Sequence, residues 1–185
     1  MNTVLKKGEV LAFKTDTVWG FGCNPNDEIA IDKIYEIKKR DSKKPLILMS
    51  NDFGKLKKYI KFIPEYAHIL IEKHLPGALT LIFEKSDFCS SKITSNSDTI
   101  GVRIPDSIDF LNVLKQYNID VLATTSCNIS NEQPVKTYNE AVEKFADVST
   151  IVEPIENSIN ENTPSTVVLC LNNEYKILRQ GAVEL

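Results

Sequence analysis

The stretch VLAFKTDTVWGFG, residues 10–22, contains the first of the alternating elements that decide the fold. Its first four residues are a short apolar run, which predicts a buried strand. A polar turn is expected next, followed by a helix over residues 27–39, because apolar residues then recur at helical spacing and Asp27 is a suitable cap. A strand, a polar loop and a helix in this order are typical of α/β proteins.

The same alternation continues through the first two thirds of the chain. Strands are expected over residues 46–49, 79–83, 100–104 and 121–125, and helices over residues 52–59, 65–74, 108–114 and 137–145, the last opened by a capping box at Thr137 and Glu140. The final third is expected to hold strands over residues 150–152, 166–171 and 176–178, the last two joined by an Asn172-Asn173 turn. Residues 153–164 are interpreted as a loop. The order predicts an α/β fold class, with one domain over residues 1–185 and a twisted mixed β-sheet flanked by helices.

The amino-acid composition indicates which kinds of ligand the protein is suited to bind. The 185 residues include 22 Lys and Arg and 25 Asp and Glu, a formal net charge of −3. The length fits one domain, and 42% hydrophobic residues can fill its core. A mildly acidic balance argues against a protein whose main partner is long nucleic acid, which usually demands a basic excess. This charge balance does not argue against binding of a small anionic ligand.

The apolar runs are strand-sized, whereas a membrane span needs about 20 residues, so no membrane partner is expected. The N-terminal residues lack the features of a secretory signal, and a cytoplasmic location follows as an expectation. Four cysteines stand far apart without a CxxC pair, which predicts reduced thiols rather than a zinc site or disulfides. His68 and His74 have a spacing that does not suit a metal pair on a helix, so no protein metal site is expected.

Polar clusters follow several predicted strands, where open α/β sheets bind ligands. The segment 14–22 offers two hydroxyls, a carboxylate and two close glycines, which fit either a ligand-binding loop or a plain turn. It lacks the third glycine of a dinucleotide fingerprint, and no GxxxxGK[ST] loop exists in the chain.

Other clusters are cationic or rich in hydroxyls. Five cations fall within residues 38–44, which fits a solvated helix end or a clamp for phosphate oxygens. Arg103 stands inside an apolar strand, where it either points outward or is anchored and binds a carboxylate. Ser126 follows a strand without a nearby base in the sequence, so we expect a hydrogen-bond donor rather than a nucleophile.

Taken together and in this order, the segments resemble the YrdC/TsaC family of threonylcarbamoyl-adenylate synthases. The resemblance rests on KTDTVWGFG, Lys38-x-Arg40 with Pro45-Leu46, Pro76-Gly77-x-x-Thr80, Gly101-Val102-Arg103-Ile104-Pro105, Ser126-x-Asn128-x-Ser130, Pro164-Ser165-Thr166 and Leu178-Arg179-Gln180-Gly181. It covers about residues 10–181 and implies a YrdC-like domain with a positively charged cleft. It also implies a reaction in which L-threonine, bicarbonate or CO2, and ATP give threonylcarbamoyl-AMP and pyrophosphate, for the threonylcarbamoyladenosine modification of tRNA.

The resemblance assigns roles to individual residues. It implies a catalytic group of Lys38, Arg40, Ser126 and Asn128, a threonine site of Thr17, Arg103, Thr124 and Ser165, and an ATP site of Arg40, Lys44, Thr99, Ser126, Pro134 and Arg179. Mg²⁺ would accompany ATP, with ligands mainly from phosphate and water. The implied partners are the tRNA threonylcarbamoyl-transfer enzymes, with at most weak binding of tRNA itself.

The chain departs from the family pattern at Lys14, Lys44, Met49, Cys127 and Asn131, which bears on ligand affinity and loop path more than on reaction type. Two other hypotheses remain open from the sequence. One is a non-catalytic RNA-binding or ribosome-associated paralogue, and the other is a carbamoyl-transfer module like that of hydrogenase maturation proteins. The net charge and the complete KxR and SxN pairs favour the synthase.

Overall fold

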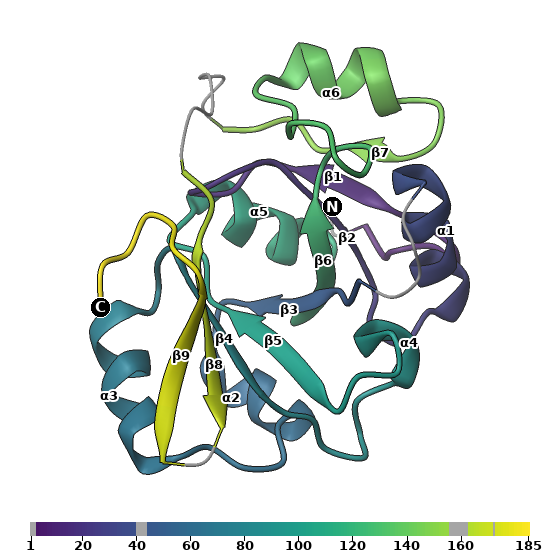
Figure 1. The fold of residues 1–185 in the computed structure, drawn as a ribbon. Coiled ribbons are helices and arrows are strands. Elements are labelled where there is room, and N and C mark those ends of the chain that lie inside the picture. Colours follow the sequence, from purple (N-terminus) through teal and green to yellow (C-terminus); the bar gives the residue numbers. More distant parts are fainter. Residues whose placement is uncertain (1–2, 40–43, 156–162, 172) are drawn as a thin grey trace.

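A computed structural model describes residues 3–39, 44–155, 163–171 and 173–185 (Figure 1). Its strands are β1 (Leu11–Phe13), β2 (Gly20–Cys23), β3 (Ile47–Ser50), β4 (Leu79–Glu84), β5 (Thr99–Arg103), β6 (Val121–Ser126), β7 (Thr150–Ile151), β8 (Thr166–Leu171) and β9 (Glu174–Arg179). Its helices are α1 (Glu28–Lys38), α2 (Phe53–Leu56), the 3₁₀ helix η1 (Lys57–Tyr59), α3 (Glu65–His74), α4 (Ser91–Thr94), α5 (Ile108–Gln116) and α6 (Tyr138–Phe145).

The strands of the described residues form one sheet in the order β7-β1-β2-β6-β3-β5-β4-β8-β9. The pairs β1–β7, β3–β5 and β4–β8 are parallel, and the other neighbours are antiparallel. The strand axes rotate from one side of the sheet to the other because the sheet is twisted, and helices lie around it (Figure 1). The predicted α/β class with a mixed, helix-flanked sheet is confirmed.

Apolar side chains form a core on each face of the sheet. The larger core joins Leu48, Val102 and Leu81 of the central strands to side chains from α1, α3 and α6. The smaller core lies under α5, where the Phe13 and Phe110 rings have centroids 5.6 Å apart. Each fully buried side chain of this size contributes about 1.5 to 3 kcal/mol. Besides Leu11 and Phe13 of β1, this core includes Met49 of β3 and Leu122 of β6.

Side-chain caps fix the helix starts that the sequence predicts. Asp27 Oδ1 accepts hydrogen bonds from the Ile29 and Ala30 amides at 3.1 Å, which confirms it as the cap of α1. Thr137 Oγ1 accepts from the Glu140 amide at 3.2 Å. The predicted capping box is only half formed, because the Glu140 carboxylate accepts from the Lys136 amide at 2.7 Å rather than from Thr137.

The expectation of a polar turn between the first strand and α1 is wrong in part, because β2 occupies residues 20–23. This strand contains Gly20 and Gly22, and because glycine is depleted in strands, residue propensities did not predict it. Packing explains the glycine at position 22, where a Cβ would lie 2.7 Å from Cε1 of Phe13. The short helix α4 had no predicted counterpart, and β9 is longer than the expected 176–178.

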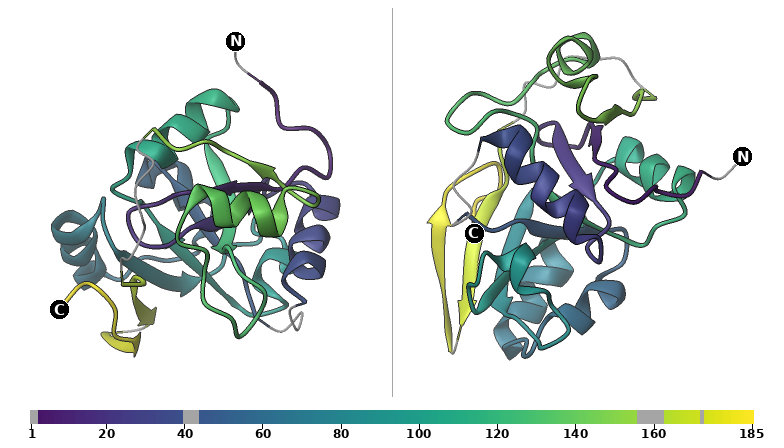
Figure 2. Two further views of the ribbon diagram at one scale, coloured as in Figure 1. Left: turned by 90° about the horizontal axis from the view of Figure 1, so that it is seen from above. Right: turned by 90° about the vertical axis from the view of Figure 1, so that its right-hand side faces the viewer.

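Several smaller expectations also have an outcome. All four cysteines are free and buried, as predicted for reduced core thiols. Asn172, in the predicted turn, and most of the predicted loop 153–164 lie outside the described residues. In the described part of the chain, no helix has the length and apolar character to cross a bilayer. The two ends of the chain lie on opposite sides of the molecule (Figure 2).

Candidate functional site

Polar residues of the central strands share one face of the sheet. Thr124 in β6 lies opposite Ile47 in β3, which lies opposite Gly101 in β5. Directly paired residues point to the same face, and so do alternate residues along a strand. Ser126, two residues after Thr124, and Arg103, two residues after Gly101, therefore point to this face as well.

The same face continues toward the far edge of the sheet. Gly101 lies opposite Ile82 in β4, and Thr80 is two residues before Ile82. Thr80 lies opposite Val167 in β8, which lies opposite Arg179 in β9. We call this surface, which carries Arg103, Thr124, Ser126, Thr80 and Arg179, the site face.

Arg103 is buried on the site face, with 2% of its surface exposed. Its Nε donates to the Gly77 carbonyl at 3.0 Å, and its two terminal nitrogens donate to Thr17 Oγ1 and Asp16 Oδ1, each at 2.6 Å. Burial lowers the pKa of Arg103, the Asp16 carboxylate opposes that effect, and Arg179 adds to it. The sequence left open whether this side chain points outward, and the structure anchors it. These bonds use three of its five N–H groups, so two remain to bind a carboxylate.

Asp16 is a site residue that the sequence interpretation did not assign. Its second carboxylate oxygen accepts from the Asp106 amide at 3.2 Å, so it joins the loop before β2 to the loop after β5. In the same loop, Thr15 Oγ1 donates to the Val18 carbonyl at 2.7 Å and lies 3.2 Å from Thr17 Oγ1. The available signal was its place beside Thr17, in a segment that the sequence marks as a possible ligand-binding loop.

Lys38 at the end of α1 reaches the loop that follows β6. Its ammonium group donates to the Ser126 carbonyl and, at 2.9 Å each, to the carbonyl and the side-chain oxygen of Asn128. Ser126 Oγ donates to that same Asn128 oxygen at 2.6 Å. Since Lys38 is only 2% exposed, these bonds place its charge inside the loop rather than at the surface. Ser126 is a hydrogen-bond donor, as the sequence predicts.

The loop after Ser126 is tied down on both sides. The Asn128 amide nitrogen donates to the Ile129 and Glu132 carbonyls at 2.8 and 2.9 Å. The backbone of Cys127 bonds Trp19 on one side and Val135 on the other. Pro134, predicted for the ATP site, is half-buried in this loop.

A second cationic group lies at the other end of the site face. Arg179 donates through Nε and a terminal nitrogen to the Ser165 carbonyl, at 3.2 and 2.8 Å, and to Ser165 Oγ at 3.2 Å. Burial lowers the pKa of Arg179. Gly181 lies so close to Pro164 that a Cβ would meet its carbonyl oxygen at 2.2 Å, which explains why only glycine fits there.

The remaining predicted residues have mixed outcomes. Thr124 is buried on the site face, with its hydroxyl 3.3 Å from the Ile47 carbonyl, and Thr99 is half-buried on the same strand as Arg103. Lys44 is exposed. Arg40 lies outside the described residues, and so does Lys43, so the predicted positively charged cleft stays a prediction. The structure therefore brings together Thr17, Arg103, Thr124 and Ser126 on one side and Ser165 and Arg179 on the other.

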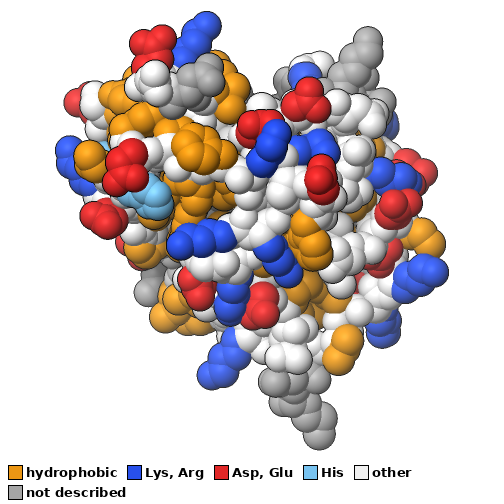
Figure 3. Space-filling model, turned by 90° about the horizontal axis from the view of Figure 1, so that it is seen from below, with side chains coloured by type: hydrophobic (Ala, Val, Ile, Leu, Met, Phe, Trp, Pro, Cys, Tyr) orange, Lys and Arg blue, Asp and Glu red, His pale blue; other side chains and the backbone are white. Residues whose placement is uncertain are grey.

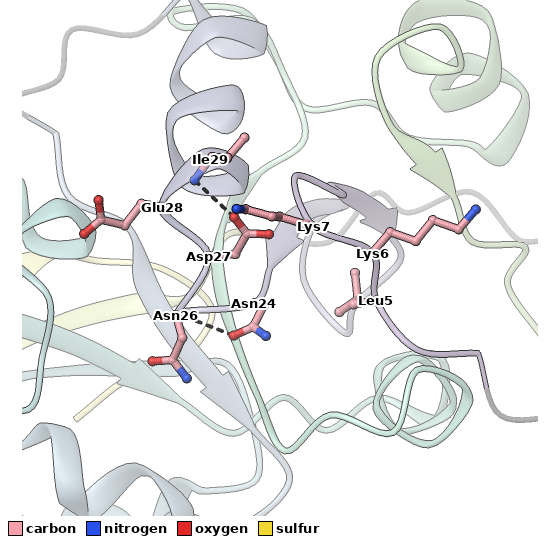
Figure 4. Close-up of a pocket in the computed structure, with 8 residues that line it drawn as sticks. All are labelled: Leu5, Lys6, Lys7, Asn24, Asn26, Asp27, Glu28 and Ile29. Carbon is pink, nitrogen blue, oxygen red and sulfur yellow. Dashed lines mark hydrogen bonds between the residues drawn. The ribbon is translucent and has the colours of Figure 1, made fainter.

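Two hollows in the described part of the surface contain none of these residues. One of about 570 Å³ lies between the N-terminal segment and the start of α1, where Asn24 and Asp27 bond nearby backbone amides (Figure 4). Another of about 380 Å³ lies between α3 and β9. Hydrophobic side chains gather on the left of Figure 3. Phe62, just before α3, and Ile69, in α3, are 61% and 65% exposed.

Comparisons with known proteins show which family the chain is similar to. Residues 3–181 match the family model Sua5_yciO_yrdC, described as "Telomere recombination". The chain is 34% identical over 182 residues to the threonylcarbamoyl-AMP synthase of Bacillus subtilis strain 168, covering 97% of this chain and 52% of that protein. Pyrococcus abyssi Sua5 complexed with L-threonine superposes with a TM-score of 0.86 at 31% identity, covering 94% of this chain and 51% of that one.

The chain thus spans about half the length of these two relatives. Escherichia coli YciO superposes with a TM-score of 0.83 over 96% of this chain and 85% of that one, and at 22% identity it supports the fold alone. The resemblance inferred from the motifs is confirmed, since one family model matches almost the whole chain and relatives exceed 30% identity. The chain belongs to the Sua5/YciO/YrdC family.

Proposed function

We propose that this chain is an L-threonylcarbamoyladenylate synthase, a nucleotidyltransferase. It would combine L-threonine, bicarbonate or CO2, and ATP into threonylcarbamoyl-AMP and pyrophosphate. The product would pass to the enzymes that transfer the threonylcarbamoyl group to tRNA.

The observation that carries the proposal is the buried guanidinium of Arg103 on the site face. Two of its N–H groups are not used by Thr17, Asp16 or Gly77, and a guanidinium with two such donors suits a carboxylate. The threonine carboxylate would bind there, with Thr17, Thr124 and Ser165 around it. The relative from Pyrococcus abyssi whose structure contains L-threonine supports this choice of substrate.

The reaction needs little covalent chemistry from the protein. The threonine amine attacks CO2 and loses a proton, which gives a carbamate. A carbamate oxygen then forms a bond to the α-phosphorus of ATP while the bond to the β-phosphate breaks, releasing pyrophosphate. The nucleophile comes from the substrate, so the protein mainly positions anions and neutralises charge. Arginines, a lysine and hydroxyls are the groups that do this.

We assign the ATP side of the site to Ser126, Thr99, Pro134, Lys44, Arg179 and Arg40. With ATP bound, Ser126 would turn its single O–H from Asn128 Oδ1 to a phosphate oxygen, while Lys38 holds the loop that carries it. This makes Lys38 a positioning residue in the described geometry. A net charge of −3 does not oppose anion binding, because potential depends on where the cations are placed.

Magnesium is proposed as the companion of ATP. Among the residues that the structure describes, no three His, Cys, Asp or Glu side chains form a cluster that could hold a metal ion. Asp16, the carboxylate on the site face, is paired with Arg103. The donor set therefore fits an ion whose ligands come mainly from phosphate and water, and whose chemistry is to neutralise phosphate charge.

The test is an assay of the purified protein with ATP, labelled bicarbonate and threonine. We expect pyrophosphate and a labelled adenylate that both require threonine. Omitting threonine and replacing it with alanine serve as controls. Tight tRNA binding with no threonine-dependent pyrophosphate would refute the synthase and favour the RNA-binding alternative.

A further inference from the structure

Thr80 lies on the site face, yet the proposed reaction gives it no role. Only 2% of its surface is exposed, and its Oγ1 lies 2.8 Å from Ser165 Oγ. The contact follows from the parallel pairing of β4 with β8, in which Leu79 lies opposite Thr166. Thr80 itself lies opposite Val167, and Ser165 is two residues before Val167 on the same face, so the two hydroxyls meet diagonally across the strand pair. The two strands are neighbours in Figure 1.

Ser165 also holds Arg179, so its hydroxyl takes part in two contacts at once. A terminal nitrogen of Arg179 lies 3.2 Å from Ser165 Oγ. Since a guanidinium has donors only, Ser165 Oγ is the acceptor in that bond. The bond to Thr80 lies on another side of the same oxygen. Two partners in different directions fix the rotamer of a serine that would otherwise turn freely.

We propose that Thr80 is a positioning residue for both substrates. Its hydroxyl holds Ser165 in the rotamer that faces threonine and supports the Arg179 guanidinium on the ATP side. The proposal rests on the proposed function, in which Ser165 binds threonine and Arg179 lines the ATP site. Thr80 acts only through Ser165 and does not touch the reacting atoms.

The geometry also sets the size and kind of the effect. Without the Thr80 hydroxyl, Ser165 gains rotational freedom and Arg179 loses its side-chain bond to Ser165. Arg179 keeps two bonds to the Ser165 carbonyl, so it is loosened rather than released. The loss falls on the affinity for threonine and ATP more than on turnover.

Three variants separate this role from a general effect of burial. Thr80→Val keeps the shape and removes the hydroxyl, and Thr80→Ser keeps the hydroxyl. Thr94→Val is the matched control, because Thr94 is fully buried in α4 and its hydroxyl bonds the Ser91 carbonyl at 3.4 Å, away from the site face. In calorimetry we expect Thr80→Val to raise the Kd for threonine about five- to tenfold, the effect of one lost hydrogen bond. Thr80→Ser and Thr94→Val should stay within about twofold of the wild type.

A second measurement does not depend on activity. The Nε–H signal of Arg179 in a ¹H–¹⁵N spectrum, assigned by its loss in Arg179→Lys, reports how firmly Ser165 holds the guanidinium, because Nε donates to the Ser165 carbonyl beside the bond to Oγ. We expect it to shift or broaden in Thr80→Val and to stay unchanged in Thr94→Val. If both this signal and the threonine Kd are the same in Thr80→Val as in the wild type, the positioning role is wrong. If the wild type forms no adenylate and the signal still changes in Thr80→Val, the proposed reaction is wrong, while Thr80 still positions Ser165 and Arg179.

Discussion

The three hydrogen bonds of the Lys38 ammonium predict that this residue stabilises the fold as well as the site. Replacing Lys38 with Met keeps a straight apolar chain of similar length and removes every donor. The carbonyls of Ser126 and Asn128 then lose the ammonium group. The Asn128 side-chain oxygen keeps its bond from Ser126 Oγ at 2.6 Å. Two carbonyl groups are therefore left without this partner.

The Ser126 carbonyl keeps the Asn128 amide at 3.1 Å, so the magnitude follows mainly from the Asn128 carbonyl. Leaving a buried acceptor unsatisfied costs about 1 to 3 kcal/mol. Part of the loss is offset, because an apolar side chain is easier to bury than an ammonium ion. We expect Lys38→Met to lower the free energy of unfolding by about 1 to 3 kcal/mol.

Urea unfolding measures this change. The single tryptophan, Trp19, is fully buried, so its fluorescence reports loss of the core. With a urea dependence of about 2 kcal/mol per molar, the midpoint should fall by about 0.5 to 1.5 M. Lys55→Met is the control, since Lys55 pairs with the exposed Asp120 and should cost at most about 1 kcal/mol. Equal midpoints for the two variants would refute the structural role of Lys38.

Three further predictions concern the site and the thiols. Ser126→Ala should raise the activation barrier by about 2 to 4 kcal/mol, the scale of one hydrogen-bond donor to the transition state, and so lower kcat/KM. A kcat/KM equal to that of the wild type would show that Ser126 has no part in the reaction. Arg103→Lys should weaken threonine binding at least about tenfold in calorimetry, because one ammonium group cannot reproduce a planar, bidentate fork, and an unchanged Kd would contradict the assigned carboxylate site. Burial raises the pKa of Cys89 from 9.0 to about 11 and that of Cys170 to about 12, so at pH 8.5 both should react slowly with a disulfide reagent until urea is added. Because the unfolded thiols ionise first, these groups make unfolding easier as the pH rises above about 9, and a urea midpoint that stays constant up to pH 11 would be the contrary result.

Much of the secondary structure could be predicted from local pattern. The helix over residues 65–74 and the strand over residues 166–171 have the predicted bounds, since each has a strong apolar pattern with clear ends. The pattern failed at β2, whose glycines have low strand propensity. It also gave no signal for α4, because a four-residue helix is too short to show a period.

The sequence by itself determined the fold class, the family and the set of side chains available for chemistry. These depend on local composition and on the order of motifs along the chain. It could not assign Asp16 or Thr80 to the site, because their partners, Arg103 and Ser165, are distant in the sequence.

The tertiary structure decided which of these side chains meet. Arg103 and Thr124 share a face only because β5 and β6 pair with β3 in one particular register. A slip of one residue would send every side chain of a strand to the opposite face, and the register depends on packing across the whole sheet. The buried position of the Lys38 side chain also depends on tertiary structure, because the carbonyls that accept its hydrogen bonds are about ninety residues away in the sequence.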